Sequence, residues 1–456
     1  MQEGQFQRVV RRKEVMALSF GAMIGWGWVA LTGDWISGAG SAGAVAAFLV
    51  GGLVITLVGL TYAELSSALP MAGGEHVYSR RALGPASSFV CTWSILFGYV
   101  SVVAFEAVAL PTVISHLTPS LDTVYLWSIA GWDVHLIWVL VGVLGAVLIT
   151  AFNFFGIEMA ARLQLIMLVL VGMGGLTLVA GASYTGVSDN LKPFFINGFE
   201  GIAGVIIMVP FMFVGFDIVA QSAEEIDLPF QQIGKIIVVS IISAVVWYIL
   251  IIWAVSMGAS ETLLRSSEVP SAEAANALFG SPAAGKIIVL AGIGGLLTSW
   301  NGFMIGGSRA IYAMAKARQL PAIFGELHPK HRTPHNAVLF IGLISIIAPF
   351  FGKPALVWLV NAGALGIVVA YIFVVTSFLV LRYREPSLER PFKVRRWRLV
   401  GGTALLLSTG LFCLYLPGSP AALAWPNEWA IVLIWVLLGV AFFFNPSARP
   451  DPEANR

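Results

Sequence analysis

The chain has 456 residues, but only 11% of them are Asp, Glu, Lys or Arg, whereas a soluble domain has about 25%. So few charges cannot cover the surface of a globular protein of this length. Hydrophobic residues make up 58% of the chain, which excludes a disordered protein and a nucleic-acid-binding protein. We therefore expect membrane lipid to surround most of the chain, as in an integral membrane protein of the all-α class.

Twelve apolar segments are long enough to be membrane-spanning helices, for which about 20 residues are needed. The loops between them are too short to hold a soluble domain. The first segment follows a charged leader over 1–14 and lacks a small-residue cleavage site, so we expect it to be retained. The predicted spans are 15–36, 42–68, 87–115, 135–156, 163–183, 200–222, 233–257, 284–314, 336–352, 355–381, 399–416 and 428–445.

The basic residues predict the orientation, because cytoplasmic loops of membrane proteins are enriched in Lys and Arg. With the N-terminus inside, 22 of the 26 basic residues fall on the cytoplasmic side. The other four are Lys192, Arg265, Lys286 and Lys353. We therefore expect a protein of the cytoplasmic (inner) membrane with both termini in the cytoplasm, including the tail over 446–456.

Glycine and proline interrupt two of the predicted spans. In span one, three glycines fall within the seven residues from Gly21 to Gly27, and each loosens a helix by about 0.5–1 kcal/mol relative to Ala. In span six, Pro210 removes a backbone donor shortly before Gly215 and Asp217. Paired interruptions indicate a midplane substrate site in a secondary transporter, where opposite helix ends suit the two charges of a zwitterion. The alternative is that these glycines only allow close helix packing.

A series of short motifs runs through the first ten spans. The motifs are Gly21–Gly33 with Gly25-x-Gly27; Tyr62-Ala63-Glu64-Leu65, Pro70 and Gly73-Gly74; Phe213-Val214-Gly215-Phe216-Asp217, Ala223-Glu224-Glu225-Ile226 and Pro229; and Arg309-Ala310-Ile311-Tyr312-Ala313-Met314-Ala315, Leu320-Pro321 and Thr333-Pro334. In this combination and order they resemble the amino acid, polyamine and organocation permease family. The resemblance implies a leucine-transporter-type fold, in which 15–183 and 184–381 form inverted repeats of five spans with discontinuous helices 1 and 6. The segment 382–445 then supplies a basic loop and two peripheral helices.

The resemblance also implies a substrate site between the two interruptions. Backbone amides around Gly25 would hold a carboxylate, carbonyls around Val214 would receive an amine, and Phe213 or Phe216 would be an aromatic gate. The family usually has a small Ser or Thr where this chain has Trp26, whose indole removes space and attracts cations. Trp26 either faces the substrate or packs against a neighbouring helix. The predicted substrate-binding residues are Ala22, Met23, Gly25, Trp26, Gly27, Tyr99, Glu106, Phe211, Phe213, Val214, Gly215, Phe216 and Asp217.

Two acidic residues lie well inside predicted spans, where a charge costs about 2.5–3.5 kcal/mol on insertion scales. Glu106 is near the middle of span three, seven residues after Tyr99 and therefore on roughly the same helix face. It is either an amine ligand or proton carrier, or a protonated structural acid. Asp217 directly follows the sixth-span interruption and either orients the unwound segment or takes part in coupling.

Coupling to an ion is the second prediction that rests on the resemblance. In sodium-coupled proteins of this fold, an ion lies between carbonyls of helix 1 and hydroxyls of helix 8. Here Gly21 and Ile24 would supply the carbonyls, and Thr298 and Ser299 the hydroxyls, for Na⁺. Those two hydroxyls alternatively bond their own backbone. Span five has no lysine, which disfavours one proton mechanism of the family but leaves protonation of Glu106 or Asp217 open.

We therefore expect a secondary active transporter that moves an amino acid or a related amine by alternating access, with no cofactor besides Na⁺ or H⁺. The alternative substrate is a carboxylate-free organic cation such as a polyamine or alkanolamine. A channel and a transport-inactive receptor are alternatives from other classes. No nucleophile elbow, P-loop or metalloprotease motif is present, so we do not expect an enzyme. The sequence predicts no oligomeric state.

Overall fold

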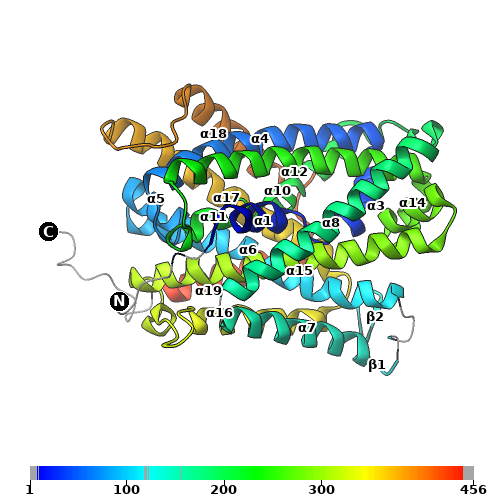
Figure 1. Cartoon of the computed structure of the whole chain (residues 1–456), viewed down its shortest axis with the longest axis horizontal. Coiled ribbons are helices and arrows are strands. Elements are labelled where there is room, and N and C mark those ends of the chain that lie inside the picture. The colour runs from blue at the N-terminus through cyan, green and yellow to red at the C-terminus, as the bar shows by residue number, and fades with distance from the viewer. Residues whose placement is uncertain (1–7, 9, 118–120, 122, 156, 445–456) are drawn as a thin grey trace.

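The computed structural model describes residues 8, 10–117, 121, 123–155 and 157–444. The predicted tail over 446–456 and residues 1–7 and 9 of the predicted leader therefore lie outside the described residues. Long helices run side by side along the longest axis of the molecule (Figure 1). The only β-sheet of the described residues is a hairpin of β1 (Tyr125–Ile129) and β2 (Trp132–His135), at the end of the molecule opposite to α5 (Glu75–Leu83).

Helices occupy all twelve segments that the sequence predicts as spans. By length and composition, nine helices of the described chain are long and apolar enough to cross a membrane, or ten if the bent first span counts as one. The segments at 336–352 and 428–445 form shorter apolar helices, so the full count of twelve spans stays a prediction. Apart from the interrupted spans one and six, the helices in these segments are α4 (Ser41–Ala68), α6 (Pro85–Leu117), α7 (Leu136–Phe155), α8 (Ile157–Thr185), α12 (Phe230–Gly258), α15 (Pro282–Lys316), α16 (His335–Ile347), α17 (Ala355–Arg384), α18 (Trp397–Leu414) and α19 (Asn427–Phe443).

Both predicted interruptions are present. Span one consists of α1 (Arg12–Met23), α2 (Gly27–Ala30) and α3 (Thr32–Ala39), with the chain unwound over 24–26 and bent by 65° before α3. Span six consists of α9 (Gly198–Ile206), α10 (Val209–Phe213) and α11 (Ile218–Gln221), with the chain unwound over 214–217.

Local sequence explains where α15 begins. The preceding short helix α14 (Pro270–Phe279) ends at Gly280, whose φ of +58° is a left-handed conformation that glycine adopts without strain. Ser281 follows and accepts a hydrogen bond from the backbone of Ala283, and Pro282 occupies the first helical position, where no backbone donor is needed. A Gly-Ser-Pro sequence thus ends one helix and starts the next.

The outward faces of the long helices are apolar. On α7, Leu140, Leu144 and Leu148 follow one another at intervals of four and are each about half exposed, so they form a single stripe on one helix face. Water would not stabilise such a stripe, whereas hydrocarbon does. This supports the membrane environment that the composition predicts.

Broken spans one and six lie inside the bundle. In Figure 1, α1, α10 and α11 are surrounded by long helices, with α4 and α12 on one flank and α7 and α16 on the other. α6 packs against α15 and α17, and α15 also packs against α1. At the periphery, α19 is fixed to α6 by two stacked indoles, those of Trp93 and Trp435, whose ring centroids lie 4.5 Å apart. The indole N–H of each tryptophan also donates a hydrogen bond to the backbone carbonyl of the other.

Candidate functional site

A small cavity lined mostly by buried residues lies between the two interruptions. It has room for about 20 Å³ of water-sized contents, which is about one water molecule. Larger cavities of about 710 Å³ beside α5 and about 320 Å³ beside Asp34 lie elsewhere in the molecule. The central cavity must therefore enlarge before it can hold a molecule of amino acid size. Its lining residues are Ala22, Met23, Gly25, Gly27, Val102, Phe105, Glu106, Phe211, Met212, Tyr248, Ser299 and Phe303.

Glycine lets the two broken spans approach each other and their neighbours closely. A Cβ on Gly27 would lie 2.7 Å from the sulfur of Met212, and one on Gly215 would lie 2.9 Å from the Cβ of Ala22. Gly215 also has a φ of +128°, which side-chain-bearing residues rarely adopt. The glycines of both spans are therefore needed at these positions, because they leave room for the two interruptions to contact each other.

Glu106 is the one acidic side chain among the described residues that line the cavity. It comes from the middle of α6, is 1% exposed, and packs on the unwound backbone of span one. A Cβ on Gly25 would lie only 2.4 Å from its Oε1 atom. The carboxyl group also lies within reach of hydrogen bonds from the Ser299 hydroxyl and the backbone N–H of Trp26, whereas its Oε2 atom has no hydrogen-bond partner in the described structure.

Tyr248 of α12 connects the two interruptions. Its hydroxyl lies 2.7 Å from the carbonyl oxygen of Met23 and 3.2 Å from that of Met212. Both carbonyls are near the ends of short helices, where the backbone has no helical partner to satisfy them. Sequence reasoning did not find Tyr248, because nothing in its own span distinguishes it from a core tyrosine.

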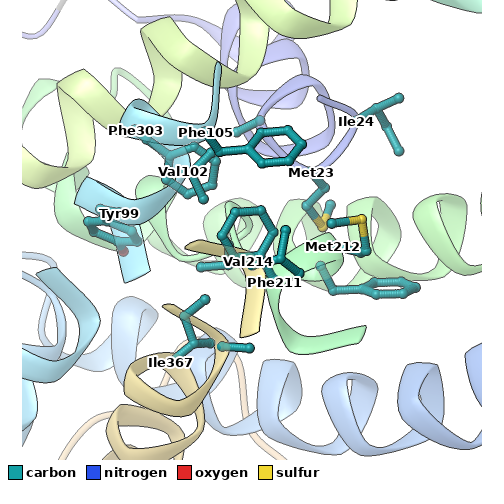
Figure 2. Close-up of a cluster of buried hydrophobic side chains, with 14 of the residues drawn as sticks. Met23, Ile24, Tyr99, Val102, Phe105, Phe211, Met212, Val214, Phe303 and Ile367 are labelled. Carbon is teal, nitrogen blue, oxygen red and sulfur yellow. The ribbon is translucent and has the colours of Figure 1, made fainter. Parts of the chain in front are cut away.

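The remaining lining residues are apolar. Val102 and Phe105 of α6 and Phe303 of α15 form one cluster with Phe211 and Met212 of the sixth span (Figure 2). The predicted residues Ala22, Met23, Gly25, Gly27, Glu106 and Phe211 do line the cavity. The sequence analysis did not include Val102 and Phe105 among the site residues. They lie four residues and one residue before Glu106 on the same helix, and this closeness to the buried acid could have indicated them.

Several other predicted residues lie outside the cavity lining. The indole of Trp26 is fully buried and faces α15, where a Cβ on Gly292 would lie 2.2 Å from its ring. Phe213 packs on Tyr248 with ring centroids 5.3 Å apart, and Phe216 packs on Tyr62 at 5.2 Å. Val214 belongs to the apolar cluster of Figure 2. In this closed form the aromatic side chain of span six that reaches the cavity is therefore Phe211.

Tyr99 and Asp217 meet each other at a level removed from the cavity. The Tyr99 hydroxyl donates to Asp217 Oδ2 at 2.5 Å, and the backbone N–H of Gly215 donates to Asp217 Oδ1 at 2.7 Å. Asp217 thereby fixes the conformation of the unwound segment. Tyr99 and Glu106 are on one helix, but seven residues separate them by about 10 Å along its axis.

A hydrogen bond joins two of the four residues of the predicted ion site, Thr298 and Gly21. The Thr298 hydroxyl donates to the carbonyl of Gly21 at 3.0 Å and also lies 2.8 Å from the carbonyl of Gly295 in its own helix. Ser299 instead faces the Glu106 carboxyl group. Ile24 directs its carbonyl toward the backbone of Gly295. The described residues contain no group of three or more His, Cys, Asp or Glu side chains that could hold a metal ion.

Buried ion pairs hold the end of the molecule that carries α5. Arg309 of α15 makes a two-pronged contact with Glu225, at 2.9 and 3.2 Å, and both side chains are at least 96% buried. Glu64 of α4 pairs with Arg382 at 2.5 Å and with Arg390 at 3.1 Å. Chain segments far apart in sequence are thus joined at this end.

Comparison with known proteins agrees with this architecture. The sequence profile described as "Amino acid permease" matches residues 14–443. The chain belongs to the amino acid permease family. Among its relatives is a protein of Bacillus subtilis named branched-chain amino acid permease BcaP, 27% identical over 98% of this chain and 94% of the relative.

Two further relatives from Bacillus subtilis show the range of named substrates within this family. A methylthioribose transporter is 27% identical over 97% of this chain and 94% of its own length. An aspartate-proton symporter is 25% identical over 91% of this chain and 80% of its own length. These relatives are named as transporters and not as enzymes. As a member of this family, the chain is an integral membrane protein.

Proposed function

We propose that this permease is a secondary active transporter that moves an amino acid or a related amine by alternating access. The observation that carries the proposal is the small cavity between the two interruptions, with the buried Glu106 carboxyl group in its wall. A buried acid that faces a cavity inside a membrane protein is expensive and is therefore expected to have a function. The names of the relatives support a small-molecule amino acid substrate.

In this proposal the free Oε2 atom of Glu106 receives the substrate ammonium group. The cavity must open for this, and the phenyl rings of Phe105, Phe211 and Phe303 then contact the substrate side chain. Backbone N–H groups at the interruption of span one, including that of Trp26, hold the substrate carboxylate. Helix ends suit these charges, because unpaired N–H groups carry partial positive charge and unpaired carbonyls carry partial negative charge.

Alternating access would use the two five-span repeats that the family resemblance implies. We place α5 and the ion pair of Arg309 with Glu225 on the cytoplasmic side, because the basic residues concentrate in the loops at that end. These contacts then form the inner closure of the transport path. The outer closure involves α3 and the cavity beside Asp34.

A carboxylate-free amine is a second candidate substrate, and one observation favours it. The Glu106 carboxyl group already lies within reach of the Trp26 N–H, where the substrate carboxylate is expected. A zwitterion would have to displace Glu106 from this position, whereas a simple amine would not. For coupling, sodium at the carbonyl of Gly21 and the hydroxyl of Thr298 is the alternative to a proton, and it needs Thr298 to release its hydrogen bond to that carbonyl.

Uptake into proteoliposomes tests the proposed function. The panel contains amino acids together with their decarboxylated amines, such as leucine with isoamylamine and arginine with agmatine. A carrier gives saturable uptake and counterflow, and the preferred member of each pair identifies the substrate class. Linear, non-saturable flux would indicate a channel, and binding without flux would indicate a receptor; either result contradicts the proposal.

A further inference from the structure

Two buried carboxyl groups face each other at the junction between α5 and span six. Glu75 is the first residue of α5, Asp217 directly precedes α11, and both are fully buried. Each carboxyl group lies within hydrogen-bonding reach of the other. We call them the inner carboxyl pair. The proximity depends on Gly74, because a Cβ there would lie 3.1–3.2 Å from the backbone of Ala220 and Gln221.

The two carboxyl groups have unequal partners. Asp217 accepts hydrogen bonds at both oxygens, from the Tyr99 hydroxyl and the Gly215 backbone. Glu75 accepts one hydrogen bond from the side-chain amide of Gln221 at Oε2, and the Tyr62 hydroxyl lies within reach of the same carboxyl group. Hydrogen bonds to an ionised carboxylate stabilise the charge. Asp217 is therefore the ionised member, and Glu75 is the member that holds a proton.

Among the described residues, no basic side chain contributes to the electrostatic surroundings of the inner carboxyl pair. The titratable side chains that face the pair are Tyr62 of α4, Tyr78 of α5, Cys91 and Tyr99 of α6, and Tyr371 of α17. Arg309 of α15 forms its ion pair with Glu225. Two adjacent buried carboxyl groups disfavour each other's ionised form, so one of them is expected to stay protonated. Burial, together with the neighbouring Asp217, accordingly raises the pKa of Glu75 well above its ordinary value.

The inner carboxyl pair joins two parts of the molecule that must move if the transporter opens inward. Two residues before Glu75, the backbone N–H of Gly73 donates a hydrogen bond of 3.1 Å to the carbonyl of Gln221 in α11. Asp217 holds Gly215, which packs on Ala22 next to the central cavity. Separation of α5 from α11 would therefore break the pair and disturb the cavity wall together.

We propose that the inner carboxyl pair is a proton-binding site that couples transport to a proton gradient. One proton is bound as an O–H bond on Glu75 and shared with Asp217 while α5 is docked on α11. When the two separate, water and not Asp217 faces Glu75, the O–H bond breaks, and the proton leaves to the cytoplasm as hydronium. This proposal rests on the proposed transport function and names the coupling ion.

The test uses the full-length protein in proteoliposomes with a pH-sensitive dye trapped inside and a mixture of the twenty common L-amino acids outside. Three quantities are measured: counterflow without a gradient, accumulation driven by an imposed difference of one pH unit, and the change in internal pH on substrate addition. The variants are Glu75→Gln, which imitates the protonated acid, and Glu75→Asp, which keeps a titratable group. Glu385→Gln, at the exposed pair with Arg81, is the control.

Wild type and the Glu385→Gln control should accumulate substrate up to about tenfold per pH unit if one proton accompanies each substrate, and the interior should acidify. Glu75→Gln should keep counterflow but lose accumulation above the external concentration, and Glu75→Asp should retain part of it. Gradient-driven accumulation by Glu75→Gln, or wild-type uptake without proton movement, would overturn the proton site while leaving the transporter intact. Absence of both uptake and counterflow in wild type, with the amino acids and also with their decarboxylated amines, would overturn the proposed function and this inference with it.

A second variant keeps the test decisive if Glu75→Gln does not fold. Tyr99→Phe removes the hydroxyl that stabilises the Asp217 charge, with almost no change in volume. Its pH midpoint for gradient-driven uptake should move to higher pH, because the pair then binds its proton more tightly. An unchanged midpoint in a folded, active Tyr99→Phe variant would contradict the proton site.

Discussion

The Oε1 atom of Glu106 lies where a side chain on Gly25 would have to be, since a Cβ at residue 25 would approach it to 2.4 Å. The glycine of the first broken span and the acid of α6 are therefore one structural unit. The absence of a side chain at one residue allows a carboxyl group from another helix to reach the unwound backbone. Substitution of either residue should affect the same site.

Gly25→Ala should displace Glu106 and reduce substrate affinity at least tenfold, because the methyl group also lies 2.9 Å from the Ser299 hydroxyl oxygen. The matched control is Gly204→Ala in α9, where a Cβ meets nothing within 4 Å and should favour the helix by about 1 kcal/mol. Saturation curves for uptake compare the two variants. Equal affinities in both would show that the Gly25 contact has no role in binding.

Trp26→Ser should destabilise the protein without changing which substrates it prefers. The indole is buried against Gly292, and loss of a buried tryptophan leaves a cavity that costs about 3–5 kcal/mol. Thermal unfolding of the purified protein measures the first effect, and the uptake panel measures the second. Trp425→Ser, at a side chain that is 75% exposed, is the control. A stable Trp26→Ser variant with altered preference would place the indole at the substrate.

The buried pair of Arg309 and Glu225 should show strong coupling in a double-mutant cycle. Removal of one partner leaves an uncompensated buried charge, which costs about 3–5 kcal/mol. Arg309→Met and Glu225→Gln should each lower the free energy of unfolding by this amount. The double variant should lose less free energy of unfolding than the sum of the two single losses. Lys192→Met, at the exposed pair with Asp189, should have little effect. Additive losses in the cycle would be inconsistent with a direct pair.

Acid pH should destabilise the protein through His76, because burial, and secondarily Arg80, lower the pKa of this histidine to about 4. The unfolded chain binds the proton at about pH 6.5, so stability falls as pH drops from 6.5 toward 4. At pH 5 this single group should cost about 2 kcal/mol. His76→Gln should lose less stability than wild type between pH 8 and pH 5 in thermal unfolding. Equal losses in both proteins would refute the assignment.

The sequence predicted the helical segments and both interruptions well, because length, apolar composition and the placement of glycine determine them locally. Glu106 was found because an acid inside an apolar span stands out on physical grounds. Phe213 and Phe216 were expected at the site, yet they face Tyr248 and Tyr62. The direction of a side chain in an unwound turn depends on the dihedral angles there, and helical periodicity does not predict them.

Residues brought in by tertiary packing could not be predicted from local patterns. Tyr248 belongs to an ordinary apolar span and gains its role only because two interrupted helices end beside its hydroxyl. Glu75 follows a pair of glycines in a loop and would be expected to face water. It is buried because α5 packs against α6 and α17 and its first residue meets Gln221 of α11, which the sequence of the loop does not indicate.

The most direct test of the account is saturable amino acid uptake by wild type and Glu106→Gln in proteoliposomes, with Glu326→Gln, an exposed loop acid, as the control. The glutamine keeps the size of the side chain and removes only its capacity for negative charge. The account predicts that wild type and Glu326→Gln give the same saturable uptake, whereas Glu106→Gln loses at least tenfold in affinity for the substrate amine. Wild-type uptake by a correctly folded Glu106→Gln variant would contradict the central role of this carboxyl group.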